Sequence, residues 1–320
     1  MELRSRLNRR ELLRNERSFQ IGVPVTNYTT KQETTHGYQV LDPIPTRNEL
    51  DSFFELRYYA LIEEGKRAAD IARTRQGGEA AEDQTRWFRE TVHQDLIDIA
   101  KEHASGDQTI EVGCGMGNLL VDLQKAGFQS LGVDLAPESV AAVRERGLDA
   151  LEGAFDTLVE TGSIESGSFD TVIFNNVLEL TFDPMRNLEA AARALRPGGV
   201  LVVRGGNDFN PLQLAAVDAL GAPEWWVSPP EHINYLNFDA VESMMRAVSV
   251  KPIHRHGEFP MELWLLAGFD YIADPSLGAE CHNRRVMLER NLPVETRRRL
   301  YRAFGAAGMG RTMVVVGKKE

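Results

Sequence analysis

The feature that most constrains the fold is a regular alternation of strand-like and helical segments between residues 87 and 206. Short runs of β-favouring residues are interleaved with segments of helical period, and Gly or Pro stands at the junctions. Strands that alternate with helices at this spacing predict a parallel sheet with helices on both faces. The expected strands are residues 108–112, 129–135, 148–153, 168–177 and 200–206.

The regions on either side of residues 86–206 lack this alternation of strands and helices. Residues 1–85 predict an N-terminal helical extension packed on a core of residues 86–206. Residues 207–320 predict irregular loops, an insertion at about 257–310, and the final two strands of the sheet. Long insertions of this kind are frequently lids or binding elements. We therefore expect the extension and the insertion to cap one edge of the sheet.

Composition excludes several classes of protein. The formal net charge of -11 argues against a general nucleic-acid binder, because affinity for phosphates comes mainly from clustered Lys and Arg. Arginines crowd residues 4–17 and 284–302, and we interpret them as solvated helix faces paired with acids. Only Cys114 and Cys281 are present, which excludes a disulfide framework and disfavours a zinc site. We expect a cytoplasmic protein without a signal peptide, membrane span or metal.

Three glycines at alternate positions follow the first strand. In "TIEVGCGMGN" they are Gly113, Gly115 and Gly117. A phosphate-binding P-loop would need Gly-Lys and then Ser or Thr, and a dinucleotide fingerprint would need Gly where Asn118 stands. Asp134 ends the second strand, where an acid can hydrogen-bond a ribose diol. The pattern predicts a ligand with a ribose but without a pyrophosphate.

S-adenosylmethionine (SAM) has this composition, since it joins an adenosine to an amino-acid tail and carries no phosphate. Glycines let the backbone approach the tail closely. Glu111 at the end of the first strand is placed to meet the ammonium of the tail, directly or through water. The alternative is a tight turn in an α/β domain without this ligand.

Four stretches carry a family resemblance. "TIEVGCGMGNLL", "LGVDLAPESV", "GSFDTVIFNNVLEL" and "LEAAARALRPGGVLVV" resemble successive motifs of class I SAM-dependent methyltransferases, over roughly residues 86–206. The resemblance implies a Rossmann-like seven-stranded sheet whose last strand is antiparallel. It also implies the three glycines at the methionine moiety, Asp134 on the ribose, Phe155 or its neighbours beside the adenine, and Asn175 at the mouth. The whole expected cofactor set is Glu111, Gly113, Cys114, Gly115, Gly117, Asp134, Leu135, Ala154, Phe155 and Asn175.

Two positions depart from the family pattern. Many relatives carry an acid where Ala154 stands here, and Asp156 follows two residues later. Many also have "LEH" after the fourth strand, where this chain has "LEL" at residues 178–180. Any general base must therefore come from elsewhere.

The best candidate for a base is His232 in "SPPEHINYLNF", beyond the fifth strand on the ligand-binding side of such sheets. A base is needed only if the nucleophile must lose a proton, and a histidine that braces the loop is the alternative. Glu231 is placed to orient the imidazole or to bind substrate. Residues expected to line the acceptor pocket are Asn207, Trp225, Trp226 and Tyr235, with Asn210 beside them; the alternative for the aromatic residues is a role as core anchors.

These observations favour a SAM-dependent methyltransferase acting at O, N or C of a small-molecule acceptor. An RNA or protein methyltransferase is one alternative, favoured by the arginines and opposed by the net charge. "NNVLEL" also lacks the Asn/Asp-Pro-Pro-aromatic motif of many nucleic-acid amino-methylating relatives. A non-catalytic SAM-binding regulator is the other alternative, because the "LEH" histidine is absent.

Overall fold

The computed structural model describes residues 27–53 and 78–320. The arginines of residues 4–17 and the part of the predicted helical extension between residues 54 and 77 lie outside the described residues. Among the residues described, none of the helices is long and apolar enough to cross a membrane.

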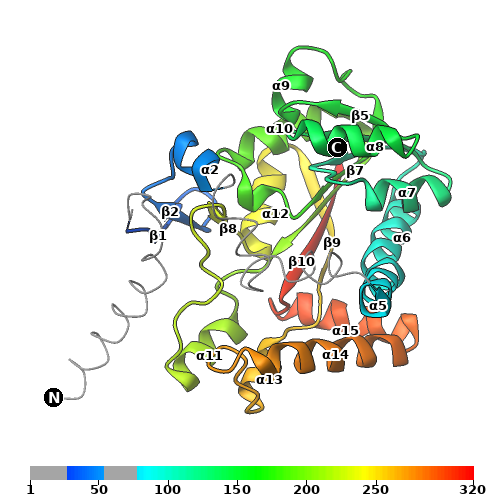
Figure 1. Cartoon of the computed structure of the whole chain (residues 1–320). Coiled ribbons are helices and arrows are strands. Elements are labelled where there is room, and N and C mark those ends of the chain that lie inside the picture. The colour runs from blue at the N-terminus through cyan, green and yellow to red at the C-terminus, as the bar shows by residue number, and fades with distance from the viewer. Residues whose placement is uncertain (1–26, 54–77) are drawn as a thin grey trace.

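A seven-stranded sheet forms the centre of the molecule (Figure 1). Its spatial order is β5-β4-β3-β6-β7-β10-β9. The strands β3, β4, β5, β6 and β7 pair in parallel, and β10 is antiparallel to both β7 and β9. This arrangement confirms the predicted Rossmann-like sheet with an antiparallel last strand. The strands are β3 (Gln108–Val112), β4 (Gln129–Asp134), β5 (Asp149–Glu152), β6 (Phe169–Asn175), β7 (Leu195–Gly206), β9 (Val250–Gly257) and β10 (Thr312–Lys319).

Helices cover both faces of the sheet, which explains why the central strands are apolar almost throughout. Successive residues of each strand face opposite cores: Phe174 and Val203 belong to one apolar cluster, and Ile173 and Val202 to another. The first cluster packs under α9 (Phe155–Glu160), α10 (Pro184–Ala194) and α12 (Phe238–Ala247). On the other face lie α5 (Gly78–Phe88), η2 (Arg89–His93), α6 (Gln94–His103), α7 (Asn118–Lys125) and α8 (Pro137–Glu145).

The boundary predicted between residues 85 and 86 falls inside α5. The helical run that precedes the sheet therefore begins earlier than the sequence suggested.

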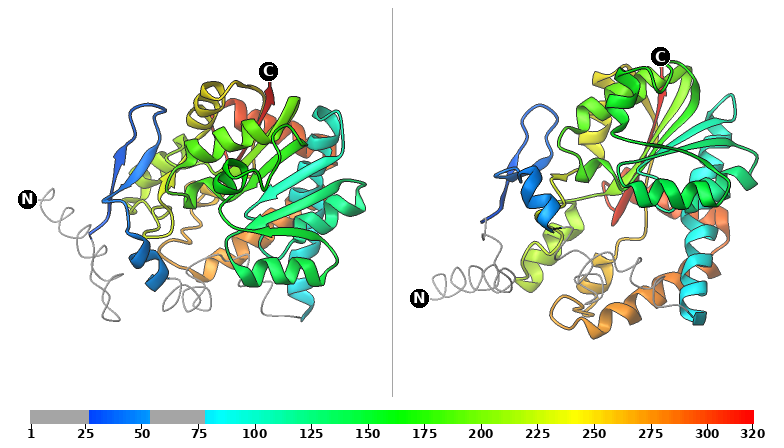
Figure 2. Two further views of the ribbon diagram at one scale, coloured as in Figure 1. Left: turned by 90° about the horizontal axis from the view of Figure 1, so that it is seen from above. Right: turned by 45° about the horizontal axis from the view of Figure 1, so that its top comes forward.

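Further helices gather at the carboxyl edge of the parallel strands. In Figure 1, α11 (Pro211–Leu220), α13 (Glu262–Leu266) and α14 (Ser276–Asn291) lie below the sheet, on the side where β7 ends and β10 begins. The right-hand view of Figure 2 shows the same grouping. Alongside β9 runs α15 (Val294–Ala306), and the turn after β6 contains the short helix η3 (Leu178–Leu180).

Two segments differ from the expectation. The predicted helical extension contains two strands, β1 (Thr29–Gln32) and β2 (Gln39–Asp42), before α2 (Arg47–Phe53). They form a separate three-stranded sheet with β8 (Asn234–Tyr235), which comes from the segment after β7. The segment after residue 210, predicted to be irregular, contains the helix α11.

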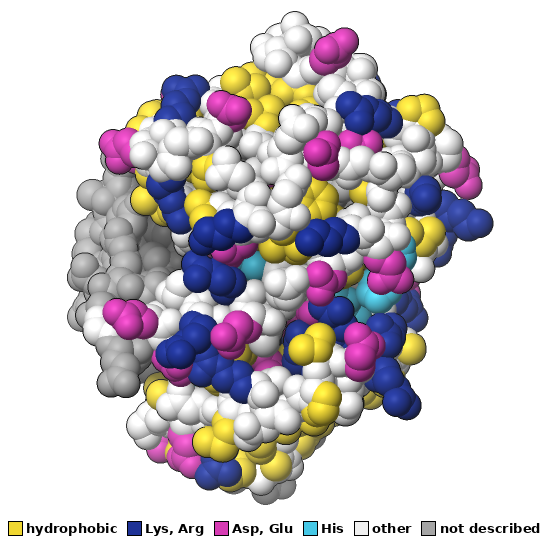
Figure 3. Space-filling view, turned by 90° about the vertical axis from the view of Figure 1, so that its right-hand side faces the viewer, with side chains coloured by type: hydrophobic (Ala, Val, Ile, Leu, Met, Phe, Trp, Pro, Cys, Tyr) yellow, Lys and Arg dark blue, Asp and Glu magenta, His cyan; other side chains and the backbone are white. Residues whose placement is uncertain are grey.

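The late arginines pair with acids, as interpreted, but several are buried rather than solvated. Arg290 contacts Asp83 at 2.9 Å, and Arg297 contacts Asp95 at 2.5 Å with a side chain that is 2% exposed. These pairs join α14 and α15 to α5 and α6. On the face shown in Figure 3, basic and acidic side chains alternate rather than form a patch of one sign.

Candidate active site

The glycine turn after β3 adopts a backbone that other residues resist. Gly113 has a φ of +68°, and a Cβ placed on it would lie 2.5 Å from Cγ2 of Val177. Gly115 has a φ of +50°, but no other atom lies within 4 Å of its Cβ position, so this part of the turn is open. Gly117 then precedes α7 directly. A side chain at Gly113 is therefore excluded by its positive φ and by the clash with Val177. At Gly115, by contrast, the backbone remains accessible to a ligand.

Asp134 at the end of β4 fixes this turn. Its Oδ2 accepts a hydrogen bond from the Gly115 amide at 2.8 Å, and its Oδ1 accepts one from the Ala136 amide at 2.9 Å. Each carboxylate oxygen keeps a further acceptor site. The next side chain, Leu135, is 62% exposed, so an apolar surface lies beside the carboxylate. This combination of acid and apolar surface suits a ribose joined to a flat base.

Glu111 in β3 is a buried carboxylate whose Oε2 has no hydrogen-bond partner among the described residues. Burial raises the pKa of Glu111 to about 8, the charge of Asp134 adds to the rise, and a hydrogen bond from Asn175 opposes it. Asn175 ends the neighbouring strand β6, so both side chains belong to the centre of the carboxyl edge. An orphaned buried acid at this place is an acceptor for a cation or a hydrogen-bond donor.

Two members of the expected cofactor set have side chains directed into the core. The Cys114 thiol packs where a Cβ on Gly132 would stand, at 2.7 Å, and burial raises the pKa of Cys114 to about 12. The Phe155 ring packs edge-on against Phe174 at 5.8 Å between centroids. Both side chains therefore pack in the protein interior, and a contact of these two residues with a cofactor stays a prediction.

The start of α9 resolves the departure noted at Ala154. Ala154 is the N-terminal cap of α9 in extended conformation, and it has no side-chain group to offer. Asp156, two residues further on, forms an ion pair with Arg186 at 2.9 Å. A contact of Asp156 with adenine would have to compete with this pair.

The loop that carries His232 is held against the turn after β6. The Ile233 amide donates to the Glu179 carbonyl at 2.8 Å, and the Asn234 side chain donates to the carbonyls of Leu178 and Thr181 at 3.0 and 2.7 Å. His232 and Glu231 thus lie beside the segment in which many relatives carry the "LEH" histidine. The structure brings a histidine to that neighbourhood from a different part of the chain.

The aromatic residues of this loop form a small cluster. Trp225 and Trp226 meet edge-on at 4.8 Å, and the Tyr235 hydroxyl accepts a hydrogen bond from the Ser228 amide at 3.0 Å. Tyr235 is fully buried, which fits the core-anchor alternative. The indole nitrogens of Trp225 and Trp226 meet no acceptor among the residues described. They remain candidates to donate to a bound molecule.

Asn207 and Asn210 brace the fold. The Asn207 amide donates to the carbonyls of Gly308 and Gly310 at 3.0 and 3.1 Å, and Asn210 caps α11 through a capping box. Both side chains are buried. The structure thus gives Asn207 a bracing role, and its contact with an acceptor stays a prediction.

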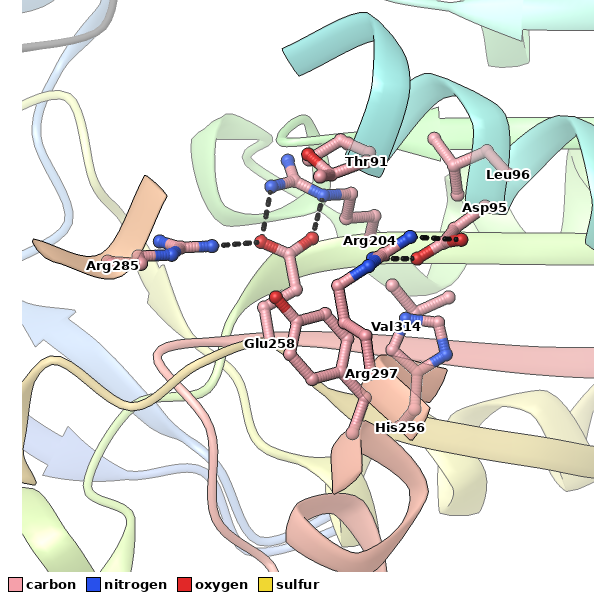
Figure 4. A pocket seen from close by; sticks show the side chains of 11 residues that line it. Thr91, Asp95, Leu96, Arg204, His256, Glu258, Arg285, Arg297 and Val314 are labelled. Atoms are coloured by element: carbon pink, nitrogen blue, oxygen red, sulfur yellow. Dashed lines mark hydrogen bonds and ion pairs between the residues drawn. The ribbon is translucent and has the colours of Figure 1, made fainter. Parts of the chain in front are cut away.

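The sequence reasoning missed a buried charge network behind Asn175 (Figure 4). Arg204 of β7 donates to Asn175 Oδ1 at 3.0 Å and forms a bidentate pair with Glu258 at 2.6 and 2.9 Å. Arg285 of α14 approaches the same carboxylate at 3.3 Å and pairs with Glu289 at 2.8 Å. The network therefore orients Asn175 and ties the insertion to the sheet. Apart from the Arg285–Glu289 pair on one helix, no local motif could reveal the network, because Asn175, Arg204 and Glu258 are far apart in the sequence.

Comparison with known proteins identifies the core. Residues 110–203 match a family described as "Methyltransferase domain". The chain is 34% identical over 105 residues to the "Ubiquinone biosynthesis O-methyltransferase" of Xanthomonas oryzae pv. oryzae, a match that covers 32% of this chain and 44% of that protein. The protein of the same name from Xanthomonas campestris pv. campestris is 36% identical over 102 residues, or 30% of this chain and 41% of the relative. The chain thus matches less than half the length of these relatives.

A solved structure shows the same fold over most of the chain. It is a SAM-dependent methyltransferase from Archaeoglobus fulgidus, with a TM-score of 0.50 and 15% identity over 82% of this chain and 100% of that one. Residues 110–203 are therefore a methyltransferase domain, and the chain has the fold of SAM-dependent methyltransferases. SAM is the cofactor that this domain implies, and the described residues present a fitting set of groups for it. The Glu111 oxygen that lacks a hydrogen-bond partner can accept from the ammonium of the cofactor's tail. The open backbone at Gly115 leaves room for that tail, and Asp134 has acceptor sites left for the ribose hydroxyls.

Among the described residues, no three or more His, Cys, Asp or Glu side chains are arranged to hold a metal ion.

Proposed function

We propose that this protein transfers the methyl group of SAM to O, N or C of a small-molecule acceptor. The observation that carries the proposal is the joint placement of the open glycine turn, Asp134 and the orphaned Glu111 at the carboxyl edge of β3 and β4. Ligands of doubly wound sheets bind at this edge, at the point where the strand order reverses. The small-molecule acceptor is supported by the relatives from Xanthomonas, which are named ubiquinone biosynthesis O-methyltransferases.

In this proposal, the cofactor and the acceptor are bound by different sets of residues. Glu111 would hold the ammonium of the cofactor's tail, and Asp134 its ribose hydroxyls, with Leu135 beside the adenine. When bound, SAM supplies an electrophilic methyl group on a sulfonium. The protein must then align the acceptor with that methyl and exclude water. The segments after β6 and β7, with His232, Glu231, Trp225 and Trp226, would form that acceptor side.

Binding of the cofactor should release a proton from Glu111. The pKa of Glu111 is raised to about 8, so the carboxyl is mostly protonated at neutral pH, whereas contact with an ammonium favours the carboxylate. We expect release of about one proton per site near pH 7 when S-adenosylhomocysteine (SAH) binds. Calorimetry in buffers of different ionisation enthalpy measures this number. Glu111→Gln should release none and Glu145→Gln, on the exposed side of α8, should behave as wild type; equal release by both variants would contradict the assignment.

Replacing His232 tests its role as the general base. If His232 takes a proton from the acceptor, His232→Ala should lower turnover about 100-fold or more, the usual contribution of such a group. Binding of SAH should not change, because the tail and ribose contacts lie elsewhere. His232→Gln keeps much of the side-chain volume and should be equally slow. Normal turnover in either variant would leave His232 with only a bracing role.

The class of acceptor can be tested before any acceptor is known. The protein is incubated with methyl-labelled SAM and with separate small-molecule, RNA and protein fractions of a cell extract. We expect SAH formation only with the small-molecule fraction. Label in RNA or protein would favour a macromolecular acceptor, and SAH binding without transfer to any fraction would favour a regulatory role. A reducing compartment such as the cytoplasm suits the two buried free thiols of this chain.

A further inference from the structure

Three polar side chains lie side by side on neighbouring strands of the sheet: Glu111 of β3, Asn175 of β6 and Arg204 of β7. Glu111 pairs in register with Ile173, and Asn175 pairs in register with Arg204. Residues in register, and residues two positions apart on one strand, point to the same face of a sheet. The Asn175 amide therefore lies between the carboxyl of Glu111 and the guanidinium of Arg204, on one face.

Both ends of this amide are engaged. Arg204 Nη1 donates to Asn175 Oδ1 at 3.0 Å, and a side-chain hydrogen bond joins Asn175 to Glu111. A guanidinium has donors only, so the contact with Arg204 decides which end of the amide carries the oxygen. The other end, the NH₂ group, is a donor and is directed to Glu111.

Arg204 is itself held in one orientation. Its Nε and Nη2 donate to the two carboxylate oxygens of Glu258 at 2.6 and 2.9 Å, as Figure 4 shows, so that Nη1 serves Asn175. The side chain of Arg204 is 6% exposed, and the Phe88 ring lies 5.6 Å from the guanidinium carbon. The Glu258 amide donates to the Thr312 carbonyl at 2.8 Å, which fixes the counter-ion. The direction of the Asn175 amide is therefore set by the interior of the protein.

We propose that Arg204 is a positioning residue of the cofactor site, which fixes the Asn175 amide so that its nitrogen donates to Glu111 and favours the carboxylate. Without Arg204 the amide would be free to turn its oxygen to Glu111. That oxygen would repel a carboxylate and accept a hydrogen bond from a protonated carboxyl instead. The consequence for the cofactor rests on the proposed function, in which the Glu111 carboxylate holds the ammonium of the tail.

The titration of Glu111 can be separated from those of its ionisable neighbours. Asp134 faces it from β4, and its charge adds to the rise in the pKa of Glu111 that burial causes. Burial raises the pKa of the Cys114 thiol to about 12 and lowers that of His256, beside the guanidinium, to about 3, so both stay neutral near pH 8. Burial also raises the pKa of Glu179 to about 7, and its signal is identified by its loss in Glu179→Gln.

The test is an NMR titration of Glu111 in the cofactor-free protein, labelled with ¹³C at the side-chain carboxyl of glutamate. The Glu111 signal is the one that Glu111→Gln lacks. In wild type the pKa of Glu111 is about 8. Arg204→Met should raise the midpoint of this titration by about one pH unit or more, because the carboxylate loses a fixed donor.

Arg285→Met is the matched control. It removes another buried guanidinium from the Glu258 carboxylate but leaves the contact of Arg204 with Asn175 in place. The Glu111 midpoint should stay close to that of wild type. An unchanged midpoint in Arg204→Met, or an equal rise in Arg285→Met, would overturn the inference.

Asn175→Leu distinguishes an action through the amide from an action of charge alone. By itself it should raise the Glu111 midpoint about as far as Arg204→Met does. In the Asn175→Leu background, Arg204→Met should add little, since the side chain through which it acts is gone. The same further rise with and without Asn175 would show that the guanidinium acts through space, which contradicts the positioning role.

A second variant keeps the test decisive if Arg204→Met does not fold. The double variant Arg204→Met/Glu258→Gln removes both partners of the buried pair, which costs less stability than removing one. It should show the same rise in the Glu111 midpoint, and an unchanged midpoint would overturn the inference.

SAH affinity provides a second readout. Arg204→Met should weaken SAH binding at pH 7 about tenfold or more in wild type and far less in Glu111→Gln. An equal loss in both backgrounds would mean that Arg204 supports only the fold, against the inference. Failure of wild type to bind SAH would overturn the proposed function, whereas the titration is made without cofactor, so the two failures are distinguishable.

Discussion

Asp134→Ala should weaken the binding of SAH about 100-fold or more. The substitution removes the carboxylate that would accept both ribose hydroxyls, and hydrogen bonds to a charged group contribute about 1.5–3 kcal/mol each. Two such bonds correspond to about 100-fold or more in the dissociation constant. It also removes the acceptor of the Gly115 and Ala136 amides, so the glycine turn loses its anchor. Calorimetric titration with SAH measures the effect.

The control for this prediction is Glu138→Ala, which removes an exposed acid four residues further on in α8. It should bind SAH as wild type does. If Asp134→Ala binds SAH normally while its unfolding transition is also unchanged, the ribose is held by other residues.

Glu258→Gln should lower the free energy of unfolding by about 3–5 kcal/mol at neutral pH, the usual cost of removing one partner of a buried ion pair. Glu258 receives two hydrogen bonds from Arg204, at 2.6 and 2.9 Å, and one from Arg285, as Figure 4 shows. Glutamine leaves both guanidinium groups buried without their counter-ion. Urea unfolding measures the difference, with the exposed Glu280→Gln as a control expected to change little.

Acid should remove this difference between wild type and Glu258→Gln. Burial alone would raise the pKa of Glu258, but the charges of Arg204 and Arg285 outweigh it and lower the pKa from 4.5 to about 2. A carboxyl with a depressed folded-state pKa stabilises the protein fully above its unfolded pKa, and the effect is lost as pH falls through the folded value. The gap in stability should therefore close between about pH 4.5 and pH 2. A gap that is constant over this range would contradict the pairing.

The sheet and the cofactor side could be predicted because their signals are local. Gly113 and Gly115 require positive φ within one turn, and Asp134 follows at the end of the next strand. Helix α11 was also predictable: Asn210 as cap, Pro211 at the first position and Gly221 after the last turn mark its limits. The prolines and aromatic residues around this helix led instead to the prediction of an irregular segment.

The buried contacts that join the insertion to the rest of the fold could not be predicted, because they form between distant segments. Arg204 and Glu258 are 54 residues apart, and the Trp87 indole donates to Glu289 across 202 residues. Separations as long as these correspond to no motif that can be recognised in the sequence alone. Likewise, Asn207 lies at the predicted mouth, but only the position of the 308–310 turn reveals that its amide is already engaged.

The most direct test of the proposed cofactor is a calorimetric titration of the wild-type protein with SAM and SAH, using NAD and ATP as controls. The structure predicts micromolar binding of SAM and SAH and none of the phosphate-bearing controls, since the glycine turn lacks the features of a phosphate cradle. Binding of NAD or ATP in their place, or of none of the four, would contradict the assignment of the carboxyl edge to SAM.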